Sequence, residues 1–128
     1  MSAQTLALVY TALSALPGVM HAAVSLGAPV GRYTVGGRFP GRLPPAWRAM
    51  ALVQLGLLLA MSCAVLDRGG ALALDLPPFV FWLALAMTGL TTIANNISPS
   101  RPERLLWGPV TLGMTIAAIG VATGGILQ

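Results

Sequence analysis

Four long apolar stretches dominate this chain of 128 residues and decide what it can fold into. They cover about residues 3–26, 47–66, 79–97 and 105–127. A helix of about 20 apolar residues crosses the roughly 30 Å hydrocarbon layer of a bilayer. A single segment surrounded by lipid satisfies its own backbone hydrogen bonds only as a helix. We therefore predict an all-α membrane protein: a bundle of four transmembrane helices that forms one integral membrane domain over residues 1–128.

The scarcity of charge excludes a soluble domain. Only 8% of the residues are charged, whereas soluble globular domains carry about 25%. Groups that hold metals or perform acid–base chemistry are equally scarce, because the chain has a single cysteine, Cys63, a single histidine, His21, and three carboxylates, Asp67, Asp75 and Glu103. These residues do not cluster at metal-ligand spacing. We expect no metal and no other cofactor, and we assign no catalytic residue.

The arginines predict the orientation of the bundle. Six of the seven lie in or beside the first and third connections, and the second connection has Arg68 alone beside Asp67 and Asp75. Cytoplasmic loops of membrane proteins retain Lys and Arg, so both termini are expected outside, in a multi-pass protein of the bacterial inner (cytoplasmic) membrane. No basic helix is present, so we expect no nucleic-acid partner. The six arginines are Arg32, Arg38, Arg42, Arg48, Arg101 and Arg104.

Polar side chains within the apolar stretches are costly unless they face the bundle interior or a cavity. In the first stretch, several of them share one helical face with Pro17. The third stretch carries a broad polar face near its end. We favour hydrogen-bonded packing between helices, and the lining of a ligand cavity is the alternative. The candidate residues are Tyr10, Ser14, His21, Gln54, Thr91, Asn95 and Asn96.

The two arginine-bearing loops carry one carboxylate between them, that of Glu103. We predict that Glu103 pairs with an arginine, since such pairs can be bidentate and would hold the loops together. The partner is Arg32, Arg38 or Arg42 of the first loop, or Arg101 or Arg104 nearby. Ser100 and Glu103 also match a helix capping box. The alternative is that the arginines contact anionic lipid headgroups.

Small residues recur along one face of the fourth stretch, at Gly113, Ala117, Gly120 and Gly124. This spacing lets two helix backbones approach closely. It predicts close helix packing, either within the bundle or against a second subunit.

Segments at the loops resemble those of small bacterial inner-membrane proteins with four helices and uncharacterised activity. The resembling segments are His21–Gly37, with Leu-Gly-Ala-Pro-Val-Gly followed by Gly-Gly, the segment Leu43–Arg48 that begins Leu-Pro-Pro, and the run from Asn96 to Pro109. This resemblance implies topology and brings no activity. The segments 27–33 and 89–92 are also similar to small four-helix fluoride channels. That similarity stops at residues 93–96, where the aromatic pore residues of the channels are missing.

These observations lead to three functional expectations. The first is a non-enzymatic membrane protein, acting as a small homo-oligomer or as an accessory subunit of a membrane complex, with membrane lipids as partners. The second is an oligomeric channel or transporter for a small solute or anion, whose polar route is lined by His21, Tyr10, Asn95 and Thr91. The third is a membrane enzyme that acts on a lipid or quinone. It is disfavoured because we expect His21 to lie deeper in the bilayer than Glu103, out of reach of an acid–base partner.

Overall fold

The computed structural model describes residues 1–125 as an all-α protein. Its helices are α1 (Ala3–Ser25), α2 (Pro45–Arg68), α3 (Pro78–Asn96) and α4 (Arg101–Ala122), with two short 3-10 turns, η1 (Gly31–Tyr33) and η2 (Val35–Gly37). All four α-helices are long and apolar enough to cross a membrane. Large apolar side chains such as Val19 and Leu90 lie exposed on the outer helix surfaces, as in a protein surrounded by lipid.

Four helices lie where the four spans are predicted, and α4 shows the largest difference in bounds. It begins at Arg101 instead of residue 105, because the Ser100 hydroxyl caps it by accepting a 3.3 Å hydrogen bond from the Glu103 amide. It ends at Ala122, and Gly124 and Gly125 follow with positive φ angles. Residues 126–128, to which the prediction in part extends, lie outside the described residues.

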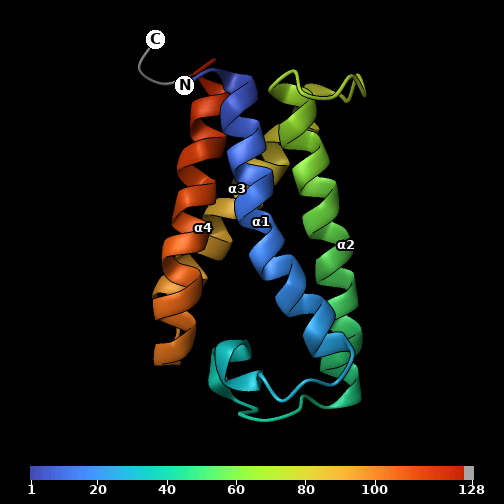
Figure 1. Ribbon diagram of the computed structural model, residues 1–128, viewed down its shortest axis with the longest axis vertical. Helices are drawn as coiled ribbons and strands as arrows, with labels where there is room; N and C mark the ends of the chain where they lie inside the picture. The colour runs from blue at the N-terminus through green and yellow to red at the C-terminus, as the bar shows by residue number, and fades with distance from the viewer. Residues whose placement is uncertain (126–128) are drawn as a thin grey trace.

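The helices form a ring with one open side. Helix α1 packs against both α2 and α4, and α3 packs against α4, but α2 and α3 touch each other much less. In Figure 1, the start of α1 lies beside the end of α4, and α1 then leans towards α2. Two helix pairs, α1 with α2 and α3 with α4, therefore draw apart along the bundle.

We name the two ends of the bundle by what lies there. At the terminal end, the backbones of Ser2 and Gly125 form a short bridge, and the loop 69–77 lies nearby (Figure 1). The opposite end, the loop end, carries the segments 26–44 and 97–100. Ser2 and Gly125, near the two limits of the described residues, thus lie at the same end of the bundle, as an even number of antiparallel helices requires.

The structure has two apolar clusters, one near each end of the bundle. The larger joins all four helices and includes Tyr10, Val65, Phe81 and Ala118. The smaller forms around Val24, Leu43 and Ala51, where the segment 26–44 packs against α1 and α2. The middle of the bundle, between these clusters and between the helix pairs, contains the candidate site.

In addition to the apolar packing, hydroxyl groups connect the helices by hydrogen bonds. The Tyr10 hydroxyl lies 2.7 Å from Thr88 Oγ1, which joins α1 to α3, and the Ser14 and Ser62 hydroxyls, 3.0 Å apart, join α1 to α2. Thr92 lies 2.6 Å from the Thr115 hydroxyl and joins α3 to α4. Among the described residues, every buried side-chain nitrogen or oxygen has a hydrogen-bond partner.

The small residues of α4 are used mainly within the chain. Ala117 and Gly120 are buried, and a Cβ atom on Gly113 would lie 3.1 Å from Leu13 Cδ1 of α1. Close approach at these positions lets α1 and α4 pack tightly. Gly124 follows the end of the helix and has open space around it.

Candidate ligand-binding cavity

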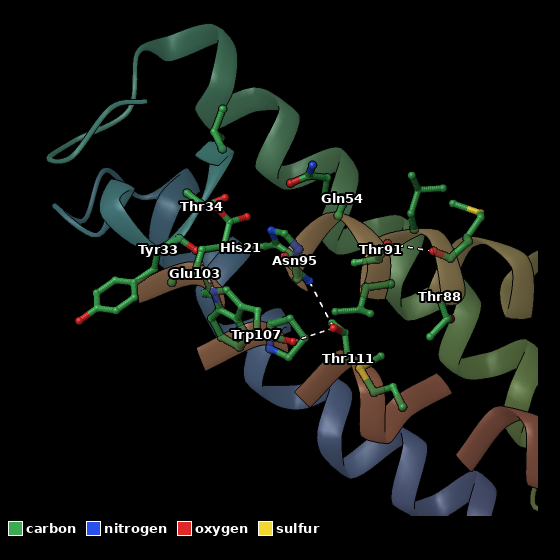
Figure 2. A pocket seen from close by; sticks show the side chains of 18 of the residues that line it. His21, Tyr33, Thr34, Gln54, Thr88, Thr91, Asn95, Glu103, Trp107 and Thr111 are labelled. Atoms are coloured by element: carbon green, nitrogen blue, oxygen red, sulfur yellow. Dashed lines mark hydrogen bonds between the residues drawn. The ribbon is translucent and has the colours of Figure 1, made fainter. Parts of the chain in front are cut away.

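A cavity of about 470 Å³ lies between the two helix pairs (Figure 2). All four helices and the turn segment 33–35 contribute to its wall. Ligand pockets in proteins commonly have volumes of about 300–1,000 Å³, so a small molecule fits here. The polar and aromatic residues of the lining are His21, Tyr33, Thr34, Trp47, Gln54, Thr88, Thr91, Asn95, Glu103, Trp107 and Thr111.

The two halves of the cavity differ in polarity. The half towards the terminal end is lined by Leu57 and Leu58 and by Met61, Met87 and Met114. Methionine side chains are flexible and polarisable, so they adapt to ligands of different shape. The half towards the loop end carries most of the polar groups, and Thr88 lies beside Met87 in the apolar half. The cavity is therefore amphipathic along its length.

Three helix ends bring the polar groups together. His21 lies in the last turns of α1, one turn after Pro17, while Asn95 lies in the last turn of α3 and Glu103 in the first turn of α4. Figure 2 shows the side chains of His21, Asn95 and Glu103 at the same end of the cavity. His21 and Glu103 both line this one cavity, although they are expected at different depths in the bilayer.

Several of these polar groups have hydrogen-bonding capacity left for a ligand. His21 and Gln54 have no hydrogen-bond partner among the described residues. Asn95 Nδ2 makes a long bond of 3.4 Å to Thr111 Oγ1. Glu103 accepts from the Gly36 amide at 2.9 Å and from the Ser98 hydroxyl at 2.8 Å, and both bonds end on Oε2. Oε1 accepts none from the described residues.

The segment 26–44 folds back to close the loop end of the cavity. Besides the bond from Gly36 to Glu103, the Trp107 indole N–H donates to the Tyr33 carbonyl at 2.8 Å, and the Ser100 hydroxyl donates to the Arg32 carbonyl at 2.5 Å. Gly36 has φ +64°, and a Cβ atom there would lie 3.3 Å from Pro99. Glycine permits both this backbone conformation and this close approach.

Glu103 links the two loops, but its hydrogen bonds go to a backbone amide and a hydroxyl in place of an arginine. The arginines have other contacts: Arg104 donates to the Ser98 carbonyl at 2.6 Å, and Arg48 donates to the Ser25 carbonyl at 3.3 Å. The capping box forms only in half, since the Ser100 amide donates to Ser98 Oγ at 3.1 Å and Glu103 turns towards the segment 26–44.

The other four arginines of the loop end lie at its surface. The Arg32 guanidinium lies over the Tyr33 ring, 4.8 Å from its centroid, and that of Arg38 lies 5.4 Å from the centroid of Phe39. Arg42 packs beside Gly27 and is exposed, as is Arg101. In the part of the chain that the structure describes, no arginine lines the cavity.

Four of the seven predicted polar residues line the cavity, namely His21, Gln54, Thr91 and Asn95. Tyr10 and Ser14 instead join helices through the hydroxyl contacts described above. Asn96 donates to the Thr92 carbonyl at 2.8 Å. The sequence does not predict that the segment 33–35 and the two tryptophans line the cavity. The fold-back of the first loop, which no local pattern signals, places the segment 33–35 here, whereas α2 and α4 position Trp47 and Trp107.

The cavity is arranged for binding. Cys63 lies on an exposed surface and does not line it. Within residues 1–125, no three His, Cys, Asp or Glu side chains are grouped so that they could hold a metal ion. The lining offers hydrogen-bonding groups and an apolar wall, which are the features of a ligand pocket.

Comparison of the chain with models of known protein families, with curated proteins and with solved structures finds no match.

Proposed function

We propose that this multi-pass membrane protein binds a small amphipathic molecule in the cavity between its helix pairs, and that it does so without catalysing a reaction. The observation that carries the proposal is the polarity of the lining, with hydrogen-bonding groups at the loop end and leucines and methionines beyond them. An amphipathic ligand matches both halves. The proposed role is non-enzymatic, as expected from the sequence. It needs no second subunit, since the cavity is formed by one chain.

The ligand enters from the lipid between α2 and α3. These two helices have the fewest contacts among neighbouring pairs of the ring. Leu57 of α2 lines the cavity and is also 45% exposed, and Gln54 of α2 and Thr91 of α3 likewise line the cavity and are exposed. An apolar tail can extend through this side into the hydrocarbon layer.

We further propose that the loop end faces the cytoplasm in a bacterial inner membrane, since it holds six of the seven arginines. The exposed guanidinium groups of Arg38, Arg42 and Arg101 then contact anionic headgroups. Membrane-impermeant thiol reagents test the orientation in a Cys63→Ser background. Arg38→Cys should be protected in intact cells, and Ala73→Cys, in the opposite loop, should be labelled. The reverse pattern overturns the orientation.

Retention of a bound amphiphile tests the binding role. The protein is exchanged extensively into fresh detergent, and native mass spectrometry then measures the bound mass. We expect an adduct with the unchanged protein and its loss in Thr91→Phe, which fills the opening of the cavity. Leu90→Phe is the matched control, because Leu90 is 66% exposed on the same helix and does not line the cavity. Absence of any adduct, or equal retention by both variants, refutes the proposed function.

A further inference from the structure

Glu103 is the only charged side chain among the described residues that line the cavity. Carboxylates that are partly removed from water are normally paired with a cation. Glu103 lacks such a partner in the described part of the chain, since its two hydrogen bonds come from the Gly36 amide and the Ser98 hydroxyl. These groups, together with the start of α4, stabilise the negative charge only by dipoles. A full countercharge is missing.

The free oxygen of Glu103 is accessible to a ligand. Both hydrogen bonds end on Oε2, and no buried side-chain oxygen lacks a partner in the described residues. Oε1, which has no partner, is therefore not buried. The nearby His21 ring, in its neutral form, offers an acceptor nitrogen, and the Asn95 amide offers an acceptor oxygen. Figure 2 shows these three side chains at one end of the cavity.

We propose that the ligand is an amphipathic amine whose protonated head binds between Glu103, His21 and Asn95, with its apolar tail along the methionine-lined half of the cavity. This inference depends on the proposed function, because it names the chemical class of the ligand in the same site. An ammonium group supplies the missing positive charge, and its N–H donors match the three acceptors. The indole of Trp107, which also lines the cavity, adds an aromatic face near the head.

The arginines of the loop end do not oppose this assignment at contact distance. Arg104 and Arg48 donate to backbone carbonyls, and Arg32 and Arg38 lie over the rings of neighbouring residues. Salt screens exposed charges beyond about 8 Å at physiological ionic strength. Glu103 acts on the head directly. An anionic head, in contrast, would meet the carboxylate with no cation in the lining to balance it.

Three probes with the same tail test the assignment: dodecylammonium, dodecanol and dodecanoate. Binding is followed by tryptophan fluorescence in phosphatidylcholine nanodiscs, in a Trp82→Phe chain whose remaining Trp47 and Trp107 both line the cavity. The same titration of a chain that also carries Thr91→Phe gives the background from lipid partitioning. We expect saturable binding in the order ammonium, alcohol, carboxylate.

The Glu103→Gln substitution separates recognition of the head from the structure of the loops. A hydrogen bond to a charged group contributes about 1.5–3 kcal/mol, so ammonium binding should weaken by about 10- to 150-fold. Dodecanol binding should stay within about twofold of its original value. Ser98→Ala is the matched control, because it removes a hydrogen bond from Oε2 and keeps the carboxylate. It should retain the preference for the ammonium probe.

The outcomes separate this inference from the proposed function. Equal binding of the three probes, tightest binding of dodecanoate, or equal losses for ammonium and alcohol in Glu103→Gln overturn the amine assignment and leave an amphiphile-binding protein. Absence of saturable binding for all three probes, combined with a purified protein that carries no adduct, overturns both.

Discussion

The direction of the hydrogen bond between the buried residues Tyr10 and Thr88 predicts how substitutions at this pair change the stability. It predicts which single substitution is more destabilising, and whether the second substitution then raises or lowers the stability of the first variant. The hydroxyl oxygens lie 2.7 Å apart, and the Thr88 hydroxyl donates to the Ala84 carbonyl, also at 2.7 Å. Its proton is thereby used, so Tyr10 must donate to Thr88. Tyr10 is 0% exposed and Thr88 1%, so water does not replace either partner.

The magnitudes follow from which atom is left unpaired. Tyr10→Phe removes the donor and leaves Thr88 bonded to Ala84, so the cost should be about 0.5–1.5 kcal/mol. Thr88→Val leaves the tyrosine proton buried without an acceptor, which costs about 1–3 kcal/mol. In the double variant, two apolar side chains of similar shape face each other, an exchange that is nearly neutral. Adding Tyr10→Phe to Thr88→Val should therefore raise the stability.

Unfolding by sodium dodecyl sulfate in mixed micelles, followed by circular dichroism, measures all four proteins of this cycle. We expect Thr88→Val to be the least stable of the four. A Tyr10→Phe variant less stable than Thr88→Val, or a double variant whose loss equals the sum of the single losses, refutes the assigned direction of the hydrogen bond. Additive losses also show that the two hydroxyls do not interact.

Three further predictions concern close approaches and the closure of the loop end. Gly31→Ala should destabilise the protein by about 1–3 kcal/mol in the same unfolding assay, since its Cβ would collide with the backbone carbonyls of Phe39 and Gly41; Gly41→Ala, which meets open space, should change stability by less than about 0.5 kcal/mol. Gly69→Ala should lower the stability by about 1–3 kcal/mol by pushing α1 away from α2, because its Cβ would lie 2.6 Å from Ala7 Cβ. Its control is Gly56→Ala, in open space within α2, which should be neutral or stabilise by up to about 1 kcal/mol. Equal effects within the pair Gly31 and Gly41, or within the pair Gly69 and Gly56, contradict the packing described. Trp107→Phe removes the 2.8 Å hydrogen bond to the Tyr33 carbonyl, which should destabilise the folded-back loop by about 0.5–1.5 kcal/mol. Trypsin should therefore cut more quickly at Arg38 and Arg42. The control is Trp82→Phe at an exposed position, which should leave the cleavage rate unchanged.

The sequence predicts the helices well because their lengths are set by the thickness of the bilayer and by local stop signals. The predicted and observed bounds differ most at α4, where hydropathy alone points to residue 105. Ser100 in fact starts the helix earlier. Arg101 and Arg104 are helical without belonging to the apolar part, so a hydropathy pattern does not include them.

The cavity lies beyond sequence prediction for a different reason. Its volume comes from the angle between two helix pairs, which depends on packing that involves the whole chain. His21 and Asn95 are recognisable as polar residues at membrane depth. The partner of Glu103 is not recognisable, because the amide of Gly36 reaches it from 67 residues away, and nothing in the composition of the first loop specifies how that loop folds back.

The loop 69–77 at the terminal end has a mechanical consequence for the cavity. The Asp67 carboxylate accepts hydrogen bonds from the amides of Leu74, Asp75 and Leu76 at 2.7–3.1 Å, which sets the path of the chain between α2 and α3. Helices α2 and α3 are thus held together at the terminal end, while their other ends can move relative to each other. A helix of 20 residues is about 30 Å long, so a rotation of about 5° at the terminal end moves the far tip by about 2.6 Å. Small changes of angle between α2 and α3 at the terminal end therefore produce larger displacements at the loop end, where the polar groups meet. The segment 26–44 must change its conformation to follow these displacements.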